Sequence, residues 1–312
     1  MILITGGLGF LGSNLAESLV KDNHQVILVT RSSVKLCNIN SIATDVIVEY
    51  GDVTDHDWLT EVILKYKPSV IFHFAGQLTS YESFEYPLYD VDVNCKSTLS
   101  ILEAVRHLNN GCRVVLGSTF WVVGNPAYLP MDEKIPCNPQ NVYAANRLAS
   151  EHYCKIYNRV YGLDTVIMRL TNTYGVKEQY DNKKKAALNY LLYRGMNGEA
   201  VTIYGKGNFF KDYIYISDVV TAAKCIMDQG TAGECYFVGT GIKTWFHDIG
   251  RWIKELTGCE IKYIEPPEYH QKIDVGSTVI DNRNLVELGW DWKVKVKYGL
   301  KFTLDYYRSE GL

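Results

Sequence analysis

The chain has 312 residues, of which 47% are hydrophobic and 21% are charged, and its formal net charge is −3. This composition is typical of a globular protein rather than a disordered or membrane-embedded one, and the small negative charge gives no general attraction to nucleic acid or to an anionic membrane. A chain of this length usually divides its core, so two lobes are expected.

The eight cysteines are scattered through the chain, with no Cys-x-x-Cys pair and no histidine pair at zinc spacing. We therefore predict no metal site and a reducing, cytoplasmic location. Residues 1–5 have the pattern of a strand, which leaves no room for a secretory leader, and no apolar stretch approaches the roughly 20 residues of a membrane helix. Neither export nor a membrane anchor is expected.

Short apolar runs alternate with amphipathic stretches through the first half of the chain, which is typical of a parallel sheet covered by crossover helices. Strands are expected at residues 2–5, 25–29, 46–49, 70–74, 113–116 and 165–169. Helices are expected at residues 13–21, 58–65, 97–108 and 142–160. The fold class is α/β, a Rossmann-type doubly wound parallel sheet, and residues 1–170 are predicted to form a dinucleotide-binding domain.

The second half is more irregular and is interrupted by glycines and by the pair Pro266-Pro267. We predict that residues 171–312 form mainly a smaller, substrate-binding lobe. Residues 235–239 include one more apolar strand that could return to the first sheet, so the two lobes are expected to be interleaved.

Glycines recur every third residue between the first strand and its helix, at Gly6, Gly9 and Gly12. Glycines at this place allow a tight turn and let backbone amides and the helix N-terminus approach a pyrophosphate. The loop, with Phe10 and Leu11 inside it, is therefore predicted to bind a dinucleotide, although an ordinary strand-to-helix turn is the alternative.

The identity of the dinucleotide depends on the ends of the next strands. The second strand ends at Arg31, where an acidic residue would favour NAD and a basic residue would accommodate the 2′-phosphate of NADP. Asp52 and Val53 follow the third strand, and Asp52 is expected to meet the adenine amino group. Ala75 and Gln77, after the fourth strand, complete the predicted cofactor site. NAD is preferred, with NADP left open because of Arg31.

Several segments resemble the extended short-chain dehydrogenase/reductase family, in particular its nucleotide-sugar epimerase and dehydratase branch. They are the glycine loop, residues 93–98, Gly117-Ser118-Thr119, Tyr143-Ala144-Ala145-Asn146-Arg147, residues 169–175, 203–207 and 212–218, and Leu288-Gly289-Trp290. The resemblance covers nearly the whole chain, and several motifs in the expected order are more specific than any one of them.

This resemblance implies redox chemistry on a sugar hydroxyl, which needs a base and an orienting donor around one oxygen. Tyr143 is the predicted base, and Thr119 matches the hydroxyl donor of the family, with its neighbour Ser118 in reserve. A free tyrosine has a pKa of about 10, so a nearby cation is needed to favour the phenolate. The oxidised nicotinamide and the residue one helical turn after Tyr143 are expected to supply this charge.

Arg147 departs from the family pattern, because the usual residue one turn after the tyrosine is lysine. An arginine keeps the positive charge and can bind ribose hydroxyls, but it does not give up a proton. The resemblance therefore predicts that the charge of Arg147 still favours the phenolate of Tyr143, but that Arg147 does not relay a proton.

Two aromatic residues, Phe120 and Trp121, stand where the 4,6-dehydratases of the family carry an acidic pair. Neither can transfer a proton there, so dehydration is disfavoured. The expected reaction is oxidation of a ring hydroxyl, most often at C4, ending either as a 4-epimerase or as a 4-dehydrogenase, for instance of a GDP-activated heptose. A non-catalytic NAD(P)-binding sensor and a small-carbonyl reductase are the alternatives.

The substrate implied by the resemblance is a nucleotide-diphosphate sugar. Asn172 matches a substrate-contacting asparagine, and Lys211 replaces an arginine expected at the diphosphate. A second such arginine would fall near Gln271, where only Lys272 is basic, while the run 183–185 is more typical of a solvated helix start. A homodimer or homotetramer is expected, because helices 97–108 and 142–160 resemble those that pair subunits in this family. His73 is expected to be a core residue.

Overall fold

A seven-stranded sheet dominates the structure, a computed structural model that describes residues 1–76, 80–181, 187–268 and 274–312. The strands are β1 (Ile2–Thr5), β2 (Val26–Thr30), β3 (Val46–Tyr50), β4 (Val70–His73), β5 (Arg113–Thr119), β6 (Thr165–Leu170), β7 (Asn172–Tyr174), β8 (Val201–Tyr204), β9 (Phe210–Lys211), β10 (Tyr213–Tyr215), β11 (Cys235–Val238), β12 (Thr244–Trp245) and β13 (Ile261–Ile264). The helices are α1 (Phe10–Lys21), η1 (Leu36–Ile42), α2 (His56–Tyr66), α3 (Ser80–Glu85), α4 (Pro87–Val91), η2 (Asp92–Lys96), α5 (Ser97–Leu108), η3 (Phe120–Val123), α6 (Val142–Tyr161), α7 (Ala187–Met196), α8 (Ile216–Gln229), α9 (Phe246–Thr257), α11 (Arg283–Glu287) and α12 (Val296–Ser309).

The large sheet has the strand order β11-β6-β5-β4-β1-β2-β3, and all of its pairs are parallel. The order runs outward from β1 in both directions, to β2 and β3 on one side and to β4, β5 and β6 on the other. Between β1 and β4 lies the switch point at which an open α/β sheet binds its ligand. The predicted doubly wound parallel fold is confirmed.

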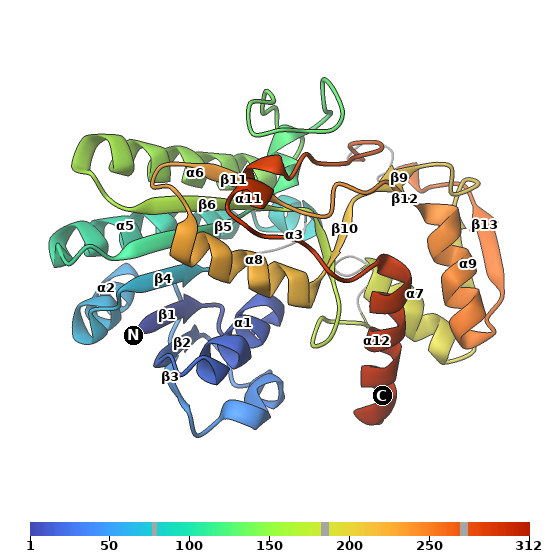
Figure 1. Ribbon diagram of the computed structural model, residues 1–312, viewed down its shortest axis with the longest axis horizontal. Coiled ribbons are helices and arrows are strands. Elements are labelled where there is room, and N and C mark those ends of the chain that lie inside the picture. Colours follow the sequence, from blue (N-terminus) through green and yellow to red (C-terminus); the bar gives the residue numbers. More distant parts are fainter. Residues whose placement is uncertain (77–79, 182–186, 269–273) are drawn as a thin grey trace.

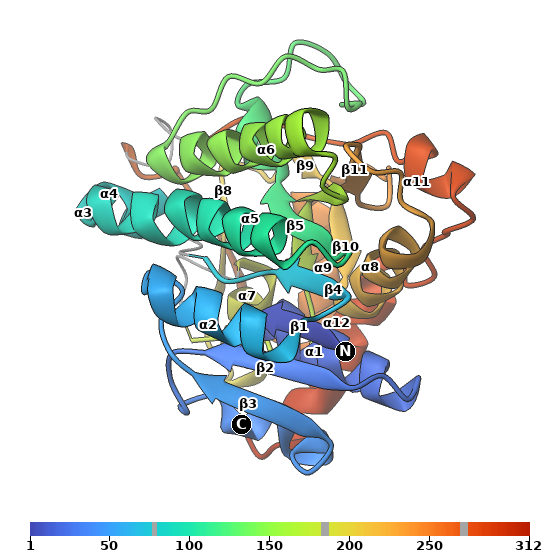
Figure 2. The same ribbon diagram turned by 90° about the vertical axis from the view of Figure 1, so that its left-hand side faces the viewer.

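Helices cover both faces of this sheet (Figures 1 and 2). On β1, Ile2 and Ile4 pack with the residues of α1 and α8, whereas Leu3 packs with those of α2 and α5. Alternate residues of a strand point to opposite faces, so a strand that is buried on both faces must be apolar throughout. This explains why the strands appear in the sequence as continuous apolar runs.

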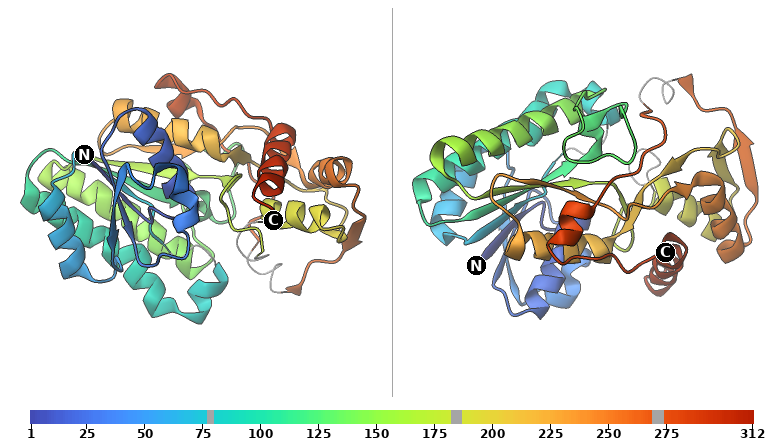
Figure 3. Two further views of the ribbon diagram at one scale, coloured as in Figure 1. Left: turned by 90° about the horizontal axis from the view of Figure 1, so that it is seen from below. Right: turned by 45° about the horizontal axis from the view of Figure 1, so that its top comes forward.

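The elements α7, α9, α12 and the short sheets β8-β13, β9-β12 and β7-β10 form the other end of the molecule (Figures 1 and 3). Their buried residues belong to the same packed cluster as the α1 and α8 face of the large sheet. No helix within the described ranges is both long and apolar enough to cross a membrane.

Two elements of the second half of the chain join the large sheet. Residues 235–238 form β11, which pairs with β6, and α8 packs against α1 on one face. The sequence indicated the return strand but not the helix that covers the sheet beside it. The division of the chain into lobes at residue 170 stays a prediction.

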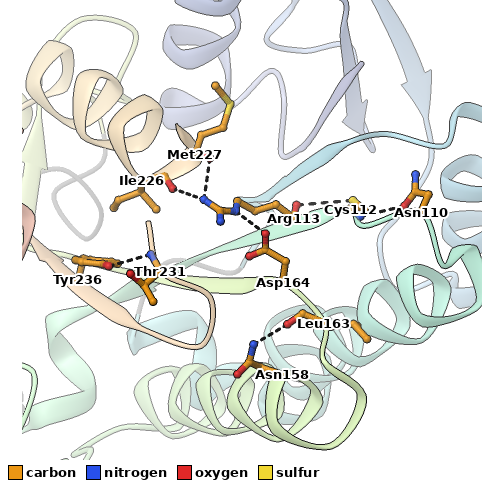
Figure 4. A network of polar contacts seen from close by, with 10 residues as sticks. All are labelled: Asn110, Cys112, Arg113, Asn158, Leu163, Asp164, Ile226, Met227, Thr231 and Tyr236. Atoms are coloured by element: carbon orange, nitrogen blue, oxygen red, sulfur yellow. Dashed lines mark hydrogen bonds and ion pairs between the residues drawn. The ribbon is translucent and has the colours of Figure 1, made fainter. Parts of the chain in front are cut away.

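Arg113 ties α8 to the sheet at the amino ends of the strands (Figure 4). Its Nε donates to Asp164 at 2.9 Å, and its Nη1 donates to the carbonyl oxygens of Ile226 and Met227 at 3.0 and 2.9 Å. These carbonyls lie in the last turn of α8, where helix carbonyls have no partner within the helix. One guanidinium thus joins β5, the start of β6 and α8.

Replacing this guanidinium should loosen α8. We expect Arg113→Ala to lower the free energy of unfolding by about 1–3 kcal/mol, because it removes charge-assisted hydrogen bonds at a half-buried site. Denaturant unfolding measures the change. Arg283→Ala, which removes an exposed pair with Asp281, is the control and should change stability by less than about 0.5 kcal/mol; equal effects of the two changes would contradict the role of Arg113.

Candidate active site

The glycine loop connects β1 to α1 through a turn in which the backbone folds back on itself. Gly6 has a φ of +68°, and the amide of Gly9 donates to the carbonyl oxygen of Gly6 at 2.9 Å. A Cβ on Gly12 would lie 2.4 Å from that same oxygen. Because such a contact excludes any side chain, the glycine at 12 is required by the turn, and the N-terminus of α1 stays open toward the pocket.

A pocket of about 600 Å³ opens at the carboxyl ends of the strands. Most of the predicted cofactor and catalytic residues line it: Gly6, Gly9, Phe10, Leu11, Gly12, Arg31, Asp52, Val53, Ala75, Ser118, Thr119 and Tyr143. They come from the ends of five parallel strands and from the first turns of α1 and α6. Gln77 lies outside the described residues. The fold therefore brings residues that are spread along the sequence from Gly6 to Tyr143 into a single site.

Tyr143 stands in the first turn of α6, and Thr119 is the last residue of β5. The helix begins at a defined point because the side chain of Asn141 accepts a hydrogen bond from the amide of Ala144 at 2.8 Å. The Thr119 hydroxyl accepts from the amide of Trp121 at 3.3 Å, which leaves its own proton available to a ligand. The two side chains expected to flank the sugar oxygen thus face one pocket.

Arg147 lies behind this pocket rather than along its wall. It is only 2% exposed, its Nη2 donates to the carbonyl oxygen of Ala75 at 3.2 Å, and its guanidinium carbon lies 5.8 Å from the centre of the Tyr143 ring. Its Nε and Nη1 have no hydrogen-bond partner within the described part of the chain. Because these two nitrogens are buried and Arg147 is not among the residues that line the pocket, its contact with ribose hydroxyls stays a prediction, whereas its charge lies close to Tyr143.

His73 is a buried part of the scaffold, as predicted. It is fully buried and forms hydrogen bonds with the hydroxyls of Thr5, at 2.7 Å, and Ser97, at 3.0 Å. Burial, together with the charge of Arg147, lowers the pKa of His73 to about 3. The imidazole is therefore neutral at physiological pH and links β1 and β4 to α5.

Ser118 is directed to a different partner from the one we expected. Its hydroxyl donates to Glu151 at 2.6 Å, and Glu151 forms an ion pair with Arg169 at 2.6 Å, both charged side chains being almost fully buried. The hydroxyl is therefore committed to a structural network below the pocket, which leaves Thr119 as the better-placed donor.

Arg31, which lines the pocket, interacts with Asp52 and Tyr89. Its Nη1 lies 3.9 Å from Asp52 and donates to the hydroxyl of Tyr89, over whose ring the guanidinium also lies at 5.8 Å. Asp52 in turn accepts two hydrogen bonds from Thr54, at 3.0 and 2.9 Å. Arg31 is thus partly neutralised where a 2′-phosphate would need it.

Of the predicted substrate residues, Asn172 and Lys211 are not among those that line the pocket, and both have partners of their own. The side-chain amide of Asn172 donates to the carbonyl oxygen of Asp212 at 2.9 Å, while Lys211 is buried, pairs with Asp274 at 3.0 Å and donates to the carbonyl oxygen of Gly276. Burial lowers the pKa of Lys211, and Asp274 opposes this shift. The substrate-binding roles of both residues stay predictions. Gln271, Lys272 and the run 183–185 lie outside the described residues.

Sequence reasoning missed part of the pocket wall. Beyond the predicted residues, the wall includes Glu82 of α3, Tyr89 of α4, Tyr86 between these helices, and Glu178, which follows β7. These short helices follow β4 directly, and residues after a strand end in an open α/β sheet are where ligand contacts gather. That rule was the available signal, but it does not say which side chains turn inward.

The glycine loop, the switch point and the aligned Tyr143 and Thr119 define a class: an α/β oxidoreductase that binds a nicotinamide dinucleotide. The comparison with known families makes this specific. Residues 2–239 match the NAD dependent epimerase/dehydratase family, and the chain belongs to this family.

Relatives and solved structures agree with this assignment. A putative UDP-glucose 4-epimerase of Methanocaldococcus jannaschii is 32% identical over 99% of both chains. A UDP-glucose 4-epimerase of Thermotoga maritima, solved with UDP-glucose, is 28% identical with a TM-score of 0.91, covering 100% of this chain and 99% of that one. The Thermus thermophilus UDP-glucose 4-epimerase, solved with NAD, is 27% identical with a TM-score of 0.87, covering 98% of each. The predicted family, and with it an NAD-dependent enzyme acting on nucleotide sugars, is confirmed.

The guanidinium of Arg147 leaves no room for a side chain at Gly76, because a Cβ at this position would lie 1.9 Å from Nη2. We expect Gly76→Ala to displace the guanidinium and to weaken NAD binding about tenfold, the equivalent of about 1.4 kcal/mol of overpacking. In an Arg147→Lys background the same change should cost less, since a lysine lacks the forked head. NAD titrations of the two single variants and the double variant measure this coupling; equal losses in both backgrounds would contradict it.

Asp52 should favour NAD by neutralising Arg31. We expect Asp52→Asn to improve NADP binding relative to NAD by a factor of about two to five, the size of an exposed ion pair. Dissociation constants for both cofactors measure this ratio. Because NAD and NADP share the adenine, the loss of an adenine contact would weaken both equally and leave the ratio unchanged. Adding Arg31→Ala should abolish the gain, and a gain that persists without Arg31 would refute the explanation.

Proposed function

We propose that this chain catalyses NAD-dependent oxidation of the C4 hydroxyl of a nucleotide-diphosphate sugar and reduces the keto sugar again, as a 4-epimerase. The observation that carries the proposal is that Tyr143 and Thr119 line the same pocket as the glycine loop, and that Thr119 is followed by Phe120 and Trp121 instead of an acidic pair. The relatives named UDP-glucose 4-epimerase support C4 as the reacting carbon and UDP as the first nucleotide to test.

The residues of this chain divide the work as follows. When bound, NAD would supply the acceptor for the hydride from the sugar carbon. Thr119 donates a hydrogen bond that holds the sugar oxygen, and Tyr143 takes its proton. The glycine loop and α1 hold the pyrophosphate, and Arg147 places a permanent positive charge beside the Tyr143 ring. When the keto sugar is reduced, the Tyr143 phenol returns this proton to the sugar oxygen, so the epimerase cycle needs no proton relay through Arg147.

A net 4-dehydrogenase is the second candidate, and one observation favours it. Within the described residues Arg147 forms no ion pair, so a permanent positive charge lies close to the nicotinamide end of the pocket. Such a charge disfavours the oxidised, positively charged ring relative to the reduced one. An enzyme that retained reduced cofactor would release the keto sugar and need a separate acceptor.

Following the absorbance of reduced nicotinamide during turnover distinguishes the two candidates. The purified protein would be mixed with UDP-, GDP-, CDP- and dTDP-sugars in turn. An epimerase returns to the oxidised form after each cycle and yields the C4 epimer, whereas a dehydrogenase accumulates reduced cofactor and a keto sugar. No turnover with any of these sugars would refute the proposed function. The nucleotide, the sugar, the assembly as a homodimer or homotetramer and the cytoplasmic location remain predictions.

Tyr143→Phe should abolish the proton transfer without disturbing the cofactor. We expect kcat to fall at least about 10²-fold while the dissociation constant for NAD stays within twofold, because only the phenolic oxygen is lost. Steady-state kinetics and NAD titration measure the two effects. Tyr161→Phe, at the exposed end of the same helix, is the control and should behave like the parent; unchanged turnover of Tyr143→Phe would contradict the mechanism.

A further inference from the structure

A buried carboxylate, Asp90 of α4, directly follows Tyr89, which lines the pocket. It is fully buried, and its Oδ1 accepts a hydrogen bond from the side-chain amide of Asn146 at 2.7 Å. Burying a carboxylate is costly unless hydrogen bonds or a positive charge compensate it. The residues around Asp90 should therefore indicate the role of this carboxylate.

Both amide partners of Asp90 adjoin Arg147. Asn146 precedes Arg147 on α6, one helical turn after Tyr143, and Asn94 also hydrogen-bonds to Asp90. The Oδ1 of Asn94 and the Nη2 of Arg147 both crowd Gly76, because a Cβ there would meet them at 2.8 and 1.9 Å. The carboxylate is thus connected to the surroundings of the guanidinium from two sides.

The charges in this region are unequal. Arg147 is buried without an ion pair in the described part of the chain, and His73, from β4, is held neutral by burial. Burial raises the pKa of Asp90, while its amide partners and the charge of Arg147 oppose the rise. The thiol of Cys95, from η2, also interacts electrostatically with Asp90. Burial raises the pKa of this thiol, so the thiol stays neutral. Asp90 is therefore the carboxylate of this cluster that interacts electrostatically with Arg147.

We propose that Asp90 is a positioning residue that balances Arg147: it holds the first turns of α6 through Asn146 and supplies the negative charge that lets the pocket accept the oxidised nicotinamide. The proposal rests on the proposed binding of NAD, but not on which sugar reacts. An unopposed guanidinium would repel the positively charged oxidised ring, whereas the reduced ring is neutral. Asp90 thus sets the relative affinity for the two redox forms.

The test is to measure the dissociation constants of NAD⁺ and NADH for the full chain and for Asp90→Asn. Asparagine keeps the shape and can still accept from Asn146, but it removes the charge. We expect the ratio of the NAD⁺ constant to the NADH constant to rise at least about threefold, the effect of one unit charge acting through a partly polar medium over roughly 10 Å. Equal weakening of both forms, or an unchanged ratio, would overturn the proposal.

Matched variants keep the result interpretable. Asp90→Glu retains the charge and should keep the ratio of the NAD⁺ and NADH constants at its parent value. Asp92 lies two residues after Asp90 and pairs with Lys96 at the surface, so Asp92→Asn should leave this ratio unchanged. Arg147→Gln should shift the ratio in the opposite direction, and this variant also tests the proposal if Asp90→Asn does not fold. Absence of sugar turnover by the parent protein would refute the proposed function, yet both binding constants would remain measurable.

Discussion

The parallel alignment of β1, β4 and β5 is the constraint on which the site depends. The register pairs Thr5 with His73 and His73 with Leu116, so the carboxyl ends of the first two strands stop at one level. β5 continues for three more residues, paired with β6, and ends at Thr119 opposite Leu170. Thr119 therefore lies beyond the carboxyl ends of β1 and β4, at the pocket that Tyr143 of α6 also lines. Backbone pairing, rather than side-chain contact, places the hydroxyl.

Arg147 adds a second constraint, which acts through charge and volume together. Its guanidinium is larger than the lysine head that is usual in this family, and it occupies the space beside Gly76, where even a methyl group would clash. The permanent charge also requires that its neighbours be neutral or negative, and the buried His73 and Asp90 meet this requirement. Arg147 thus affects both the packing and the electrostatics beside Tyr143.

The sequence predicted the parts of the structure that depend on local pattern. The strand at residues 2–5 and the helix at residues 97–108 have the predicted bounds, because burial on two faces and helical periodicity are visible in a short window. Partners far apart in the chain were not predictable in this way. Glu151 is 33 residues from Ser118, and Asp274 is 63 residues from Lys211, and no periodic pattern encodes either contact. The motifs located the candidate site, whereas the side-chain directions had to come from the fold.

The return of the chain to the large sheet has a consequence for how the molecule holds together. β11 covers the outer edge of β6, and α8, clamped by Arg113, covers one face of the same sheet. A fragment that ended at residue 170 would keep every motif of the dinucleotide site, but it would present β6 as a bare, apolar edge open to pairing with other chains. The edge of the dinucleotide-binding half is therefore covered by residues that lie more than 40 positions further along the chain, in α8 and β11.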